Sequence, residues 1–305
     1  MKAIIISSLL LSCAVSVIAG ENKKSDISYV SEDYISDGIF TQGVEGPAVD
    51  KNGVLYAVNY QQQGTIGRVV GKNKVDTLLT LKNGSIGNGI RFDGKGNMYI
   101  ADYVNHNILK VPVSALKYGG DVSDSVQVFA HENKMNQPND LAIMDNGILF
   151  ASDPNWANGT GNLWRIDQDG IVTLLESNMG TTNGIEVSPD NKTLYVNESV
   201  QRNVWRYDLD DLGNVSNKQL LISFPDFGMD GMRTDKQGNI YIARYGAGQI
   251  AVVSPQGKLI DTIKLNGQFP TNVAFGGEND RVLYITMQKR GAIEVVSLGS
   301  AGRIF

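Results

Sequence analysis

The chain has 305 residues with 27 basic and 32 acidic side chains, which gives a formal net charge of −5 at pH 7. This mild acidity, without any cluster of basic residues, argues against nucleic acid as a partner. The one cysteine, Cys13, excludes an intramolecular disulfide, so the fold must be stabilised by an apolar core.

The first twenty residues have the character of a secretory signal peptide. Lys2 is followed by a charge-free apolar run over 3–19 that ends in small residues. We therefore expect cleavage of residues 1–20 and a secreted or periplasmic protein. The alternative is a lipoprotein cleavage box at 10–13 with lipidation of Cys13, although Leu11 is bulky for that site. The run is too short for a membrane span, and no other stretch approaches that length.

Residues 21–305 repeat one pattern six times. Each copy contains a short apolar strand with an aromatic residue at its second position, as in Leu55-Tyr56-Ala57-Val58 and Ile240-Tyr241-Ile242-Ala243. Successive aromatic residues are 43, 51, 45, 46 and 43 positions apart. A period near 45 residues with clear strands predicts propeller blades rather than a helical solenoid. The six aromatic residues are Tyr56, Tyr99, Phe150, Tyr195, Tyr241 and Tyr284.

The pattern predicts a single all-β domain over 21–305, a six-bladed β-propeller of four-stranded blades. The sixth repeat offers only three strands, because the chain ends shortly after Leu298. An unassigned strand within 27–40 is expected to complete this last blade and close the ring. A polar insertion at 117–124 accounts for the longest step, and no helix of any length is expected.

One polar residue opens each repeat, 11 or 12 positions before the aromatic residue. The innermost strands of a propeller line its central channel, so equivalent positions form a ring at one mouth. Turn chemistry also favours Asn-Gly and Asp-Gly pairs, but each repeat has a separate turn, and Glu45 is not a turn residue. We therefore expect six converging side chains, which are Glu45, Asn88, Asn139, Asn183, Asp230 and Asn272.

Two carboxylates and four amide oxygens suit a hard divalent cation that takes six to eight oxygen ligands. The chain has two histidines and one cysteine, which disfavours zinc or copper at this position. Ca²⁺ is the expected ion, and Mg²⁺ or Mn²⁺ are alternatives.

Several separated motifs resemble the metal-site motifs of the gluconolactonase and regucalcin (senescence marker protein) family. They are Glu45-Gly46-Pro47, Asn139-Asp140, Asn183-Gly184 and Asp230-Gly231-Met232, and the segment 272–277 resembles that family's last blade. The resemblance implies that Glu45, Asn183 and Asp230 hold calcium, with Asn139 at or beside the ion and facing the substrate. The segment 150–154 resembles the bacterial gluconolactonase branch, which implies that Asp153 lies near the pocket.

The activity implied by this resemblance is hydrolysis of a sugar-type lactone or related ester. The cation would polarise the lactone carbonyl and lower the pKa of a bound water, and Asp230 would act as general base. Phosphotriester hydrolysis and a non-catalytic binding propeller stiffened by the ion remain alternatives. The candidate substrate-binding residues are Asn88, Asn139, Asn272, Asp153 and His106, the last because its loop can reach the channel mouth.

Several further residues have weaker expectations. Strand alternation predicts that Arg233 points away from the channel, and a substrate clamp is the alternative role for this residue. Trp164 and Trp205 occupy equivalent third-strand positions, which favours packing between blades. The loops around Tyr103 and 155–158 are expected over the pocket. The oligomeric state stays open.

Overall fold

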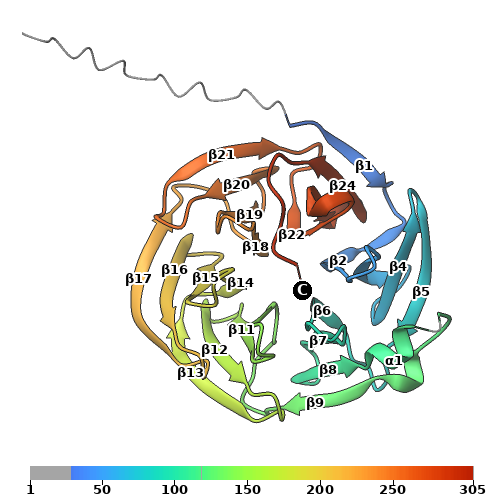
Figure 1. The fold of residues 1–305 in the computed structure, drawn as a ribbon, viewed down its shortest axis with the longest axis horizontal. Coiled ribbons are helices and arrows are strands. Elements are labelled where there is room, and N and C mark those ends of the chain that lie inside the picture. The colour runs from blue at the N-terminus through green and yellow to red at the C-terminus, as the bar shows by residue number, and fades with distance from the viewer. Residues whose placement is uncertain (1–28, 118, 305) are drawn as a thin grey trace, which may run out of the picture.

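The computed structural model describes residues 29–117 and 119–304. Within them, six antiparallel four-stranded sheets stand around a central axis like the blades of a wheel (Figure 1). The predicted six-bladed propeller is therefore confirmed. The predicted signal peptide lies outside the described residues. No helix in the described part of the chain is long and apolar enough to cross a bilayer.

Each blade runs from an inner strand at the channel to an outer strand at the rim. The first three blades are β2 (Phe40–Val49), β3 (Leu55–Tyr60), β4 (Thr65–Gly71) and β5 (Lys74–Thr80); β6 (Gly87–Phe92), β7 (Met98–Asp102), β8 (Asn107–Val111) and β9 (Gln127–His131); and β10 (Leu141–Ile143), β11 (Leu149–Asn155), β12 (Thr160–Ile166) and β13 (Val172–Met179).

The other three blades follow the same order. They are β14 (Thr182–Val187), β15 (Thr193–Glu198), β16 (Asn203–Leu209) and β17 (Val215–Ser223); β18 (Met232–Thr234), β19 (Ile240–Arg244), β20 (Gln249–Val253) and β21 (Leu259–Lys264); and β22 (Pro270–Gly276), β23 (Val282–Met287) and β24 (Ala292–Ser297), completed by β1 (Ser31–Ile35).

Aspartate side chains shape several of the turns between the first and second strands. In the second blade, Asp93 Oδ1 accepts hydrogen bonds from the backbone N–H groups of Lys95 at 3.0 Å and Asn97 at 2.8 Å. Tyr99, the aromatic residue of this repeat, donates its hydroxyl to Asp93 Oδ2 at 3.3 Å. Such local bonds replace strand pairing and turn the chain back on itself. The repeated turn and aromatic residue are thus parts of one hairpin.

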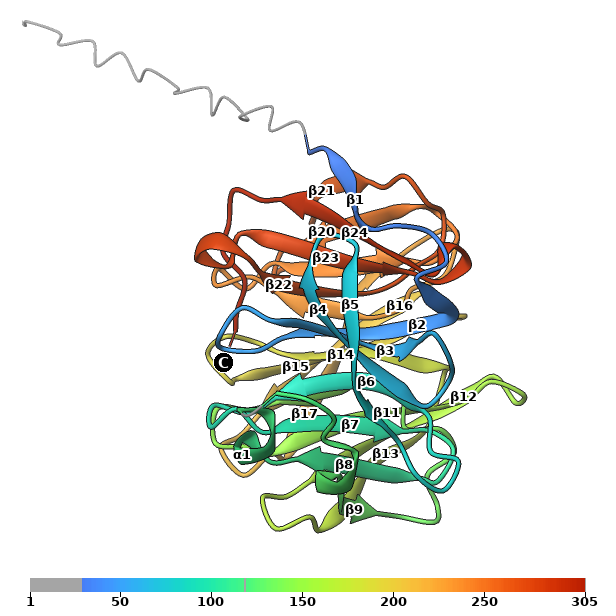
Figure 2. The same cartoon turned by 90° about the vertical axis from the view of Figure 1, so that its right-hand side faces the viewer.

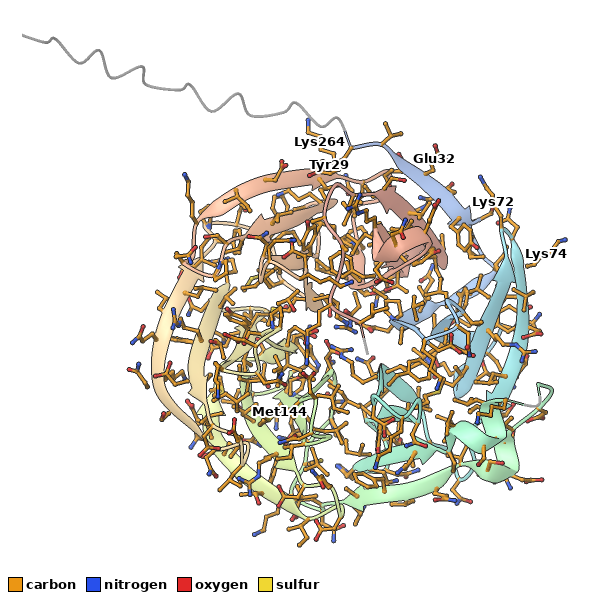
Figure 3. All side chains as sticks on the ribbon, viewed as in Figure 1. Tyr29, Glu32, Lys72, Lys74, Met144 and Lys264 are labelled. Atoms are coloured by element: carbon orange, nitrogen blue, oxygen red, sulfur yellow. The ribbon has the colours of Figure 1, made fainter. Side chains whose placement is uncertain are left out.

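Apolar side chains from neighbouring blades fill the space between them. Val58 and Ile66 of the first blade, for example, share a fully buried cluster with Ile90 and Ile100 of the second. In Figure 3 side chains fill the space between the sheets, while charged side chains such as Lys72 project outward from the rim. Burial of each large aliphatic side chain contributes roughly 1.5–3 kcal/mol, so blade contacts stabilise the wheel without a disulfide.

The N-terminal strand β1 closes the wheel by pairing antiparallel with β24, with Ser31 opposite Val296 (Figure 1). Arg290 reinforces this joint by donating to Asp33 Oδ2 at 2.7 Å and to the buried Glu294 Oε1 at 2.7 Å. Ser31 also donates its hydroxyl to Glu294 Oε2 at 2.6 Å. The structure confirms that a strand within 27–40 completes the last blade.

Helical structure in the described residues is limited to single turns. They are α1 (Val113–Leu116), η1 (Ser123–Ser125), η2 (Glu278–Asp280) and η3 (Gln288–Arg290). The strand boundaries differ from expectation mainly at the channel. β2 begins upstream of Glu45, at Phe40, whereas β10 and β18 begin only after Asn139 and Asp230.

The two faces of the wheel differ. In Figure 2 the C-terminal end lies on one face, and the β11–β12 hairpin projects from the opposite face. Figure 1 shows the end of the chain at the axis. It is held there by a bridge between Gly302 and Asp235 and by the Arg303 N–H, which donates to the Thr234 carbonyl at 3.0 Å. The C-terminal segment therefore crosses the channel mouth on its own face of the wheel.

Candidate metal and substrate site

A cavity of about 650 Å³ lies at the channel mouth on the face opposite the C-terminal end. Five of the six predicted ring residues line it: Glu45, Asn88, Asn139, Asn183 and Asp230. The sixth, Asn272, is completely buried behind them and donates its Nδ2 to Glu45 Oε2 at 3.2 Å. Asn272 thus fixes Glu45 and, contrary to expectation, does not present its side chain to a substrate.

Glycines explain why these side chains can converge. A Cβ on Gly46, which has φ of +57°, would lie 2.0 Å from the carbonyl oxygen of Asn88 in the next blade. A Cβ on Gly231 would lie 1.9 Å from the Asn272 side chain. Four of the six ring residues are therefore followed by glycine because the next blade passes close to them, and hairpin turns are not the cause.

Three oxygen atoms at the cavity are buried without a hydrogen-bond partner: Glu45 Oε1, Asn139 Oδ1 and Asn183 Oδ1. Leaving a buried polar atom unsatisfied costs roughly 1–3 kcal/mol, so three around one cavity require an explanation. They belong to three of the four predicted metal ligands. In the described chain no three His, Cys, Asp or Glu side chains are placed to hold a metal ion together, so a site here combines carboxylates with amides. Such a donor set fits a hard divalent cation.

The two carboxylates repel each other across the cavity. Burial raises the pKa of Glu45 to about 8, and the charge of Asp140 adds to the rise, against the opposing effects of the Gly46 N–H, Asn272 and Arg233. Burial also raises the pKa of Asp230 well above its usual range, with further contributions from Glu45 and Asp140. A hydrogen bond from Asn183 opposes that rise. This electrostatic state favours the arrival of a cation.

A layer of paired charges lies deeper in the channel. Arg91 Nη1 lies 3.2 Å from Asp140 Oδ1, and Arg233 Nη1 lies 3.3 Å from Asp140 Oδ2. Glu186 lies 3.9 Å from both guanidinium groups. Burial and the nearby Arg91 lower the pKa of Arg233 to about 10. All four side chains are buried, so each charge is matched inside the protein.

The prediction that Arg233 points away from the channel is wrong. Simple alternation fails because the inner chain is not a regular strand between Asp230 and Met232, where β18 begins. The second and fourth blades show related irregularities, with shifts in register between Gly87 and Ile90 and between Thr182 and Ile185. Arg91, Glu186 and Arg233 each stand three positions after a ring residue in the sequence. This spacing is the sequence signal that would have located the charged layer.

Asp153 and His106 do not line the cavity. Asp153 is completely buried and accepts hydrogen bonds from Trp164 Nε1 at 2.8 Å and from the Gln137 N–H at 2.6 Å. It positions the segment that brings Gln137 to the cavity, instead of contacting a substrate itself. His106 occupies the β7–β8 turn with φ of 56°, and Tyr103 of the same turn lines the cavity in its place.

Turns between the second and third strands supply much of the cavity wall. Tyr103 and Trp156 come from the two loops expected over the pocket. Other residues of the wall were not predicted from the sequence, including Gln63, Tyr245 and Gln288. These positions differ in residue type from blade to blade, so the repeat pattern contains no signal for them. Trp164 packs in the core between blades as expected, and Trp205 is half-buried.

The comparisons with known proteins agree with this architecture. A gluconolactonase from Zymomonas mobilis is 32% identical over 225 residues, which are 65% of this chain and 60% of that enzyme, so the chain spans less than two thirds of that relative. A diisopropyl-fluorophosphatase from Loligo vulgaris is 24% identical over 281 residues, 82% of this chain and 87% of that protein.

A solved structure described as a calcium-binding protein, regucalcin, from Agrobacterium tumefaciens has a TM-score of 0.75 at 20% identity and covers 90% of this chain and 96% of that chain. This likeness shows the fold. The family described as SMP-30/Gluconolactonase/LRE-like region matches residues 44–289, which is most of the chain. The protein therefore belongs to the SMP-30/gluconolactonase/LRE-like family.

Proposed function

We propose that this protein is a calcium-dependent hydrolase that opens a sugar-type lactone in the cavity at the channel mouth. One observation carries the proposal: Glu45, Asn139, Asn183 and Asp230 line a single cavity, and three of them have buried oxygen atoms without hydrogen-bond partners. The family and its gluconolactonase relative support the reaction class. The calcium-binding description of the regucalcin structure supports the ion.

Glu45, Asn139, Asn183 and Asp230 would hold the ion, and Asn272 would keep Glu45 in place. When bound, the ion polarises a lactone carbonyl and stabilises negative charge on its oxygen. Mg²⁺ or Mn²⁺ would use the same oxygen donors. Asn88 and Asn139 line the wall, where their amide groups can bind substrate hydroxyls.

Asp230 moves the proton in this proposal. A water oxygen bonds to the lactone carbonyl carbon while an Asp230 carboxylate oxygen accepts its proton. The bond between that carbon and the ring oxygen then breaks, and Asp230 returns the proton to the departing oxygen. The product is an open-chain hydroxy acid. The same Asp230 carboxylate serves both transfers, because an ionised carboxylate accepts the proton from water and its protonated form donates it to the departing oxygen.

Phosphotriester hydrolysis is a second candidate function. The fluorophosphatase relative aligns with 82% of this chain, whereas the gluconolactonase relative aligns with 65% of it. Both reactions place an electrophilic centre with a polar oxygen beside a cation, so the ring geometry suits either. The wall of amide and hydroxyl groups favours a hydroxylated substrate, and we rank lactone hydrolysis first for this reason.

A pH-indicator assay with the chelator-treated protein tests the proposal. We expect acid release from uncharged aldonolactones such as glucono-1,5-lactone when calcium is added back, and none without it. Turnover of diisopropyl fluorophosphate but no lactone would instead support the second candidate. A rise in melting temperature with calcium, without turnover of either class, would identify a binding propeller and contradict both enzyme proposals.

We also propose that the protein acts outside the cytoplasm, in the periplasm or the medium. The charge-free run over 3–19 supports this location. N-terminal sequencing of the mature protein should show a start at Gly20 or Glu21. A start at Cys13 with a bound lipid would support the lipoprotein alternative. An uncleaved protein that begins at Met1 and is found in the cytoplasmic fraction would contradict the proposal.

A further inference from the structure

The cavity wall is uncharged apart from the two ring carboxylates. Glu45 and Asp230 are acidic, and no Lys, Arg or His is among the described residues that line the cavity. The rest of the polar wall consists of amide and hydroxyl groups. Four glutamines from four separate segments contribute to it: Gln42, Gln63, Gln137 and Gln288. An amide both donates and accepts hydrogen bonds, as a hydroxyl group does.

The surrounding structure holds the side chain of Gln288 and the backbone of Gln137. Tyr245 donates its hydroxyl to Gln288 Oε1 at 2.5 Å, which directs the Gln288 amide nitrogen as a donor. The backbone of Gln137 is held by the buried Asp153 at 2.6 Å. At the rim, Trp156 is 45% exposed and offers a flat apolar surface to one side of a sugar ring. Gln288 is thus preorganised to donate a hydrogen bond to a neutral polar group.

Three arginines near the cavity are engaged by other groups of the protein. Arg91 and Arg233 lie deeper in the channel against Asp140. Arg244 forms an ion pair with Asp226 at 3.0 Å and stacks on the Phe224 ring. Figure 3 shows Lys72, Lys74 and Lys264 projecting from the rim of the wheel, away from the channel. None of these cations is in position to meet a negative group in the cavity.

We propose that the cavity selects uncharged, polyhydroxylated lactones and rejects lactones that carry a phosphate, sulfonate or carboxylate away from the reacting ester. This inference rests on the proposed function and adds the substrate class. The two ring carboxylates offset the charge of a bound divalent ion, so no net positive charge remains for a second anion. An anionic substituent would lose hydration without gaining a counter-ion, which is unfavourable.

The test compares two lactones that differ in one substituent, with calcium present. We expect kcat/KM for glucono-1,5-lactone to exceed that for 6-phosphoglucono-1,5-lactone by at least about 100-fold. Comparable values for the two would overturn the selectivity inference while leaving the lactonase proposal intact. Turnover of neither lactone would overturn the proposed function and the inference together.

A charge placed in the wall should relax the selectivity. Gln288→Lys and, separately, the more exposed Gln63→Lys should each raise the ratio of kcat/KM for the phosphorylated over the neutral lactone about tenfold. Gln219→Lys on the outer strand β17 adds the same charge outside the cavity and should leave the ratio unchanged. Melting curves confirm folding of each variant. An unchanged ratio in folded Gln288→Lys and Gln63→Lys variants would contradict the inference.

Discussion

The channel contains two groups of buried carboxylates that the protein treats in opposite ways. At the mouth, Glu45 and Asp230 face each other across a cavity whose described lining has no basic residue. Deeper in the channel, Asp140 lies between the guanidinium groups of Arg91 and Arg233. Both groups come from the inner chain of the blades. They differ in whether the protein supplies its own cation.

This difference shows which carboxylates are available for function. A buried ion pair such as the one at Asp140 is satisfied in the folded protein, and it leaves nothing for a ligand to neutralise. The mouth combines raised pKa values with three unsatisfied oxygens, so a divalent ion would relieve both conditions. The deeper layer acts on the mouth with both signs, since the charge of Asp140 adds to the pKa rise of Glu45 while Arg233 opposes it.

The largest expected effect follows removal of a carboxylate at the mouth. Glu45→Gln and Asp230→Asn should each lower lactonase kcat/KM by about 10³-fold or more, because a ligand and, for Asp230, the base are lost. Without calcium at pH 8, Glu45→Gln should melt above the wild type, since one repelling charge is gone. The exposed Glu278→Gln is the matched control. Parent-level turnover by either mouth variant would contradict the assignment.

The pH dependence of stability tests the electrostatics of the mouth without any mutation. Glu45 has an ordinary pKa of 4.5 when unfolded and about 8 when folded, so the native state binds more protons between these values. The free energy of unfolding of the calcium-free protein should therefore fall as pH rises from 4.5 to 8, by on the order of 4 kcal/mol.

Urea denaturation at several pH values measures this loss, and saturating calcium should remove most of it. The ion holds both carboxylates in their charged form, so protons no longer distinguish the folded from the unfolded state. A calcium-free protein whose stability rises over this pH range would contradict the electrostatic account of the mouth.

In the deeper layer, loss of a carboxylate should lower the stability of the protein, whereas loss of Glu45 at the mouth should raise it. Asp140→Asn leaves Arg91 and Arg233 buried with less compensation and should lower the free energy of unfolding by about 3 kcal/mol, with or without calcium. Asp76→Asn breaks the more exposed pair with Arg68 and should cost less than about 1 kcal/mol. Equal effects of the two substitutions would show that the deeper charges are not matched as described.

Within the deeper layer, a smaller effect than that of Asp140→Asn is expected where the layer ends near the C-terminus. Arg303 donates to Asp145 Oδ1 at 2.9 Å and lies 3.4 Å from Glu186 Oε1. Arg303→Met should lower the free energy of unfolding by about 1–2 kcal/mol and leave calcium affinity unchanged, because the mouth lies on the other face. The exposed Arg281→Met is the control. A large loss of calcium affinity would show that the regions are coupled.

The sequence predicted the wheel and the ring for a physical reason. Every blade must bury an apolar inner hairpin against its neighbour, so Tyr99 and its turn recur at a nearly constant spacing. The ring residues recur with them, because glycines such as Gly46 and Gly231 permit close approach between blades. These requirements repeat in each blade, and repetition is visible in a single sequence.

The rest of the site depends on features that do not repeat. Arg233 was misplaced because irregular backbone interrupts the alternation of side chains. Asp153 was placed at the pocket by resemblance, whereas its hydrogen bonds to Trp164 and Gln137 make it a support behind the wall. Gln288 was missed because its role depends on Tyr245, which is distant in sequence and belongs to another blade.

Calcium titration by calorimetry tests the central claim most directly. Calcium added to the chelator-treated wild-type protein at pH 7 should bind at one site per chain. Because the pKa of Glu45 is raised to about 8 and that of Asp230 is also raised, binding should release protons, which buffers with different ionisation enthalpies will detect. Glu45→Gln should abolish the binding. No binding at millimolar calcium, or equal binding by Glu45→Gln, would contradict a metal site at the channel mouth.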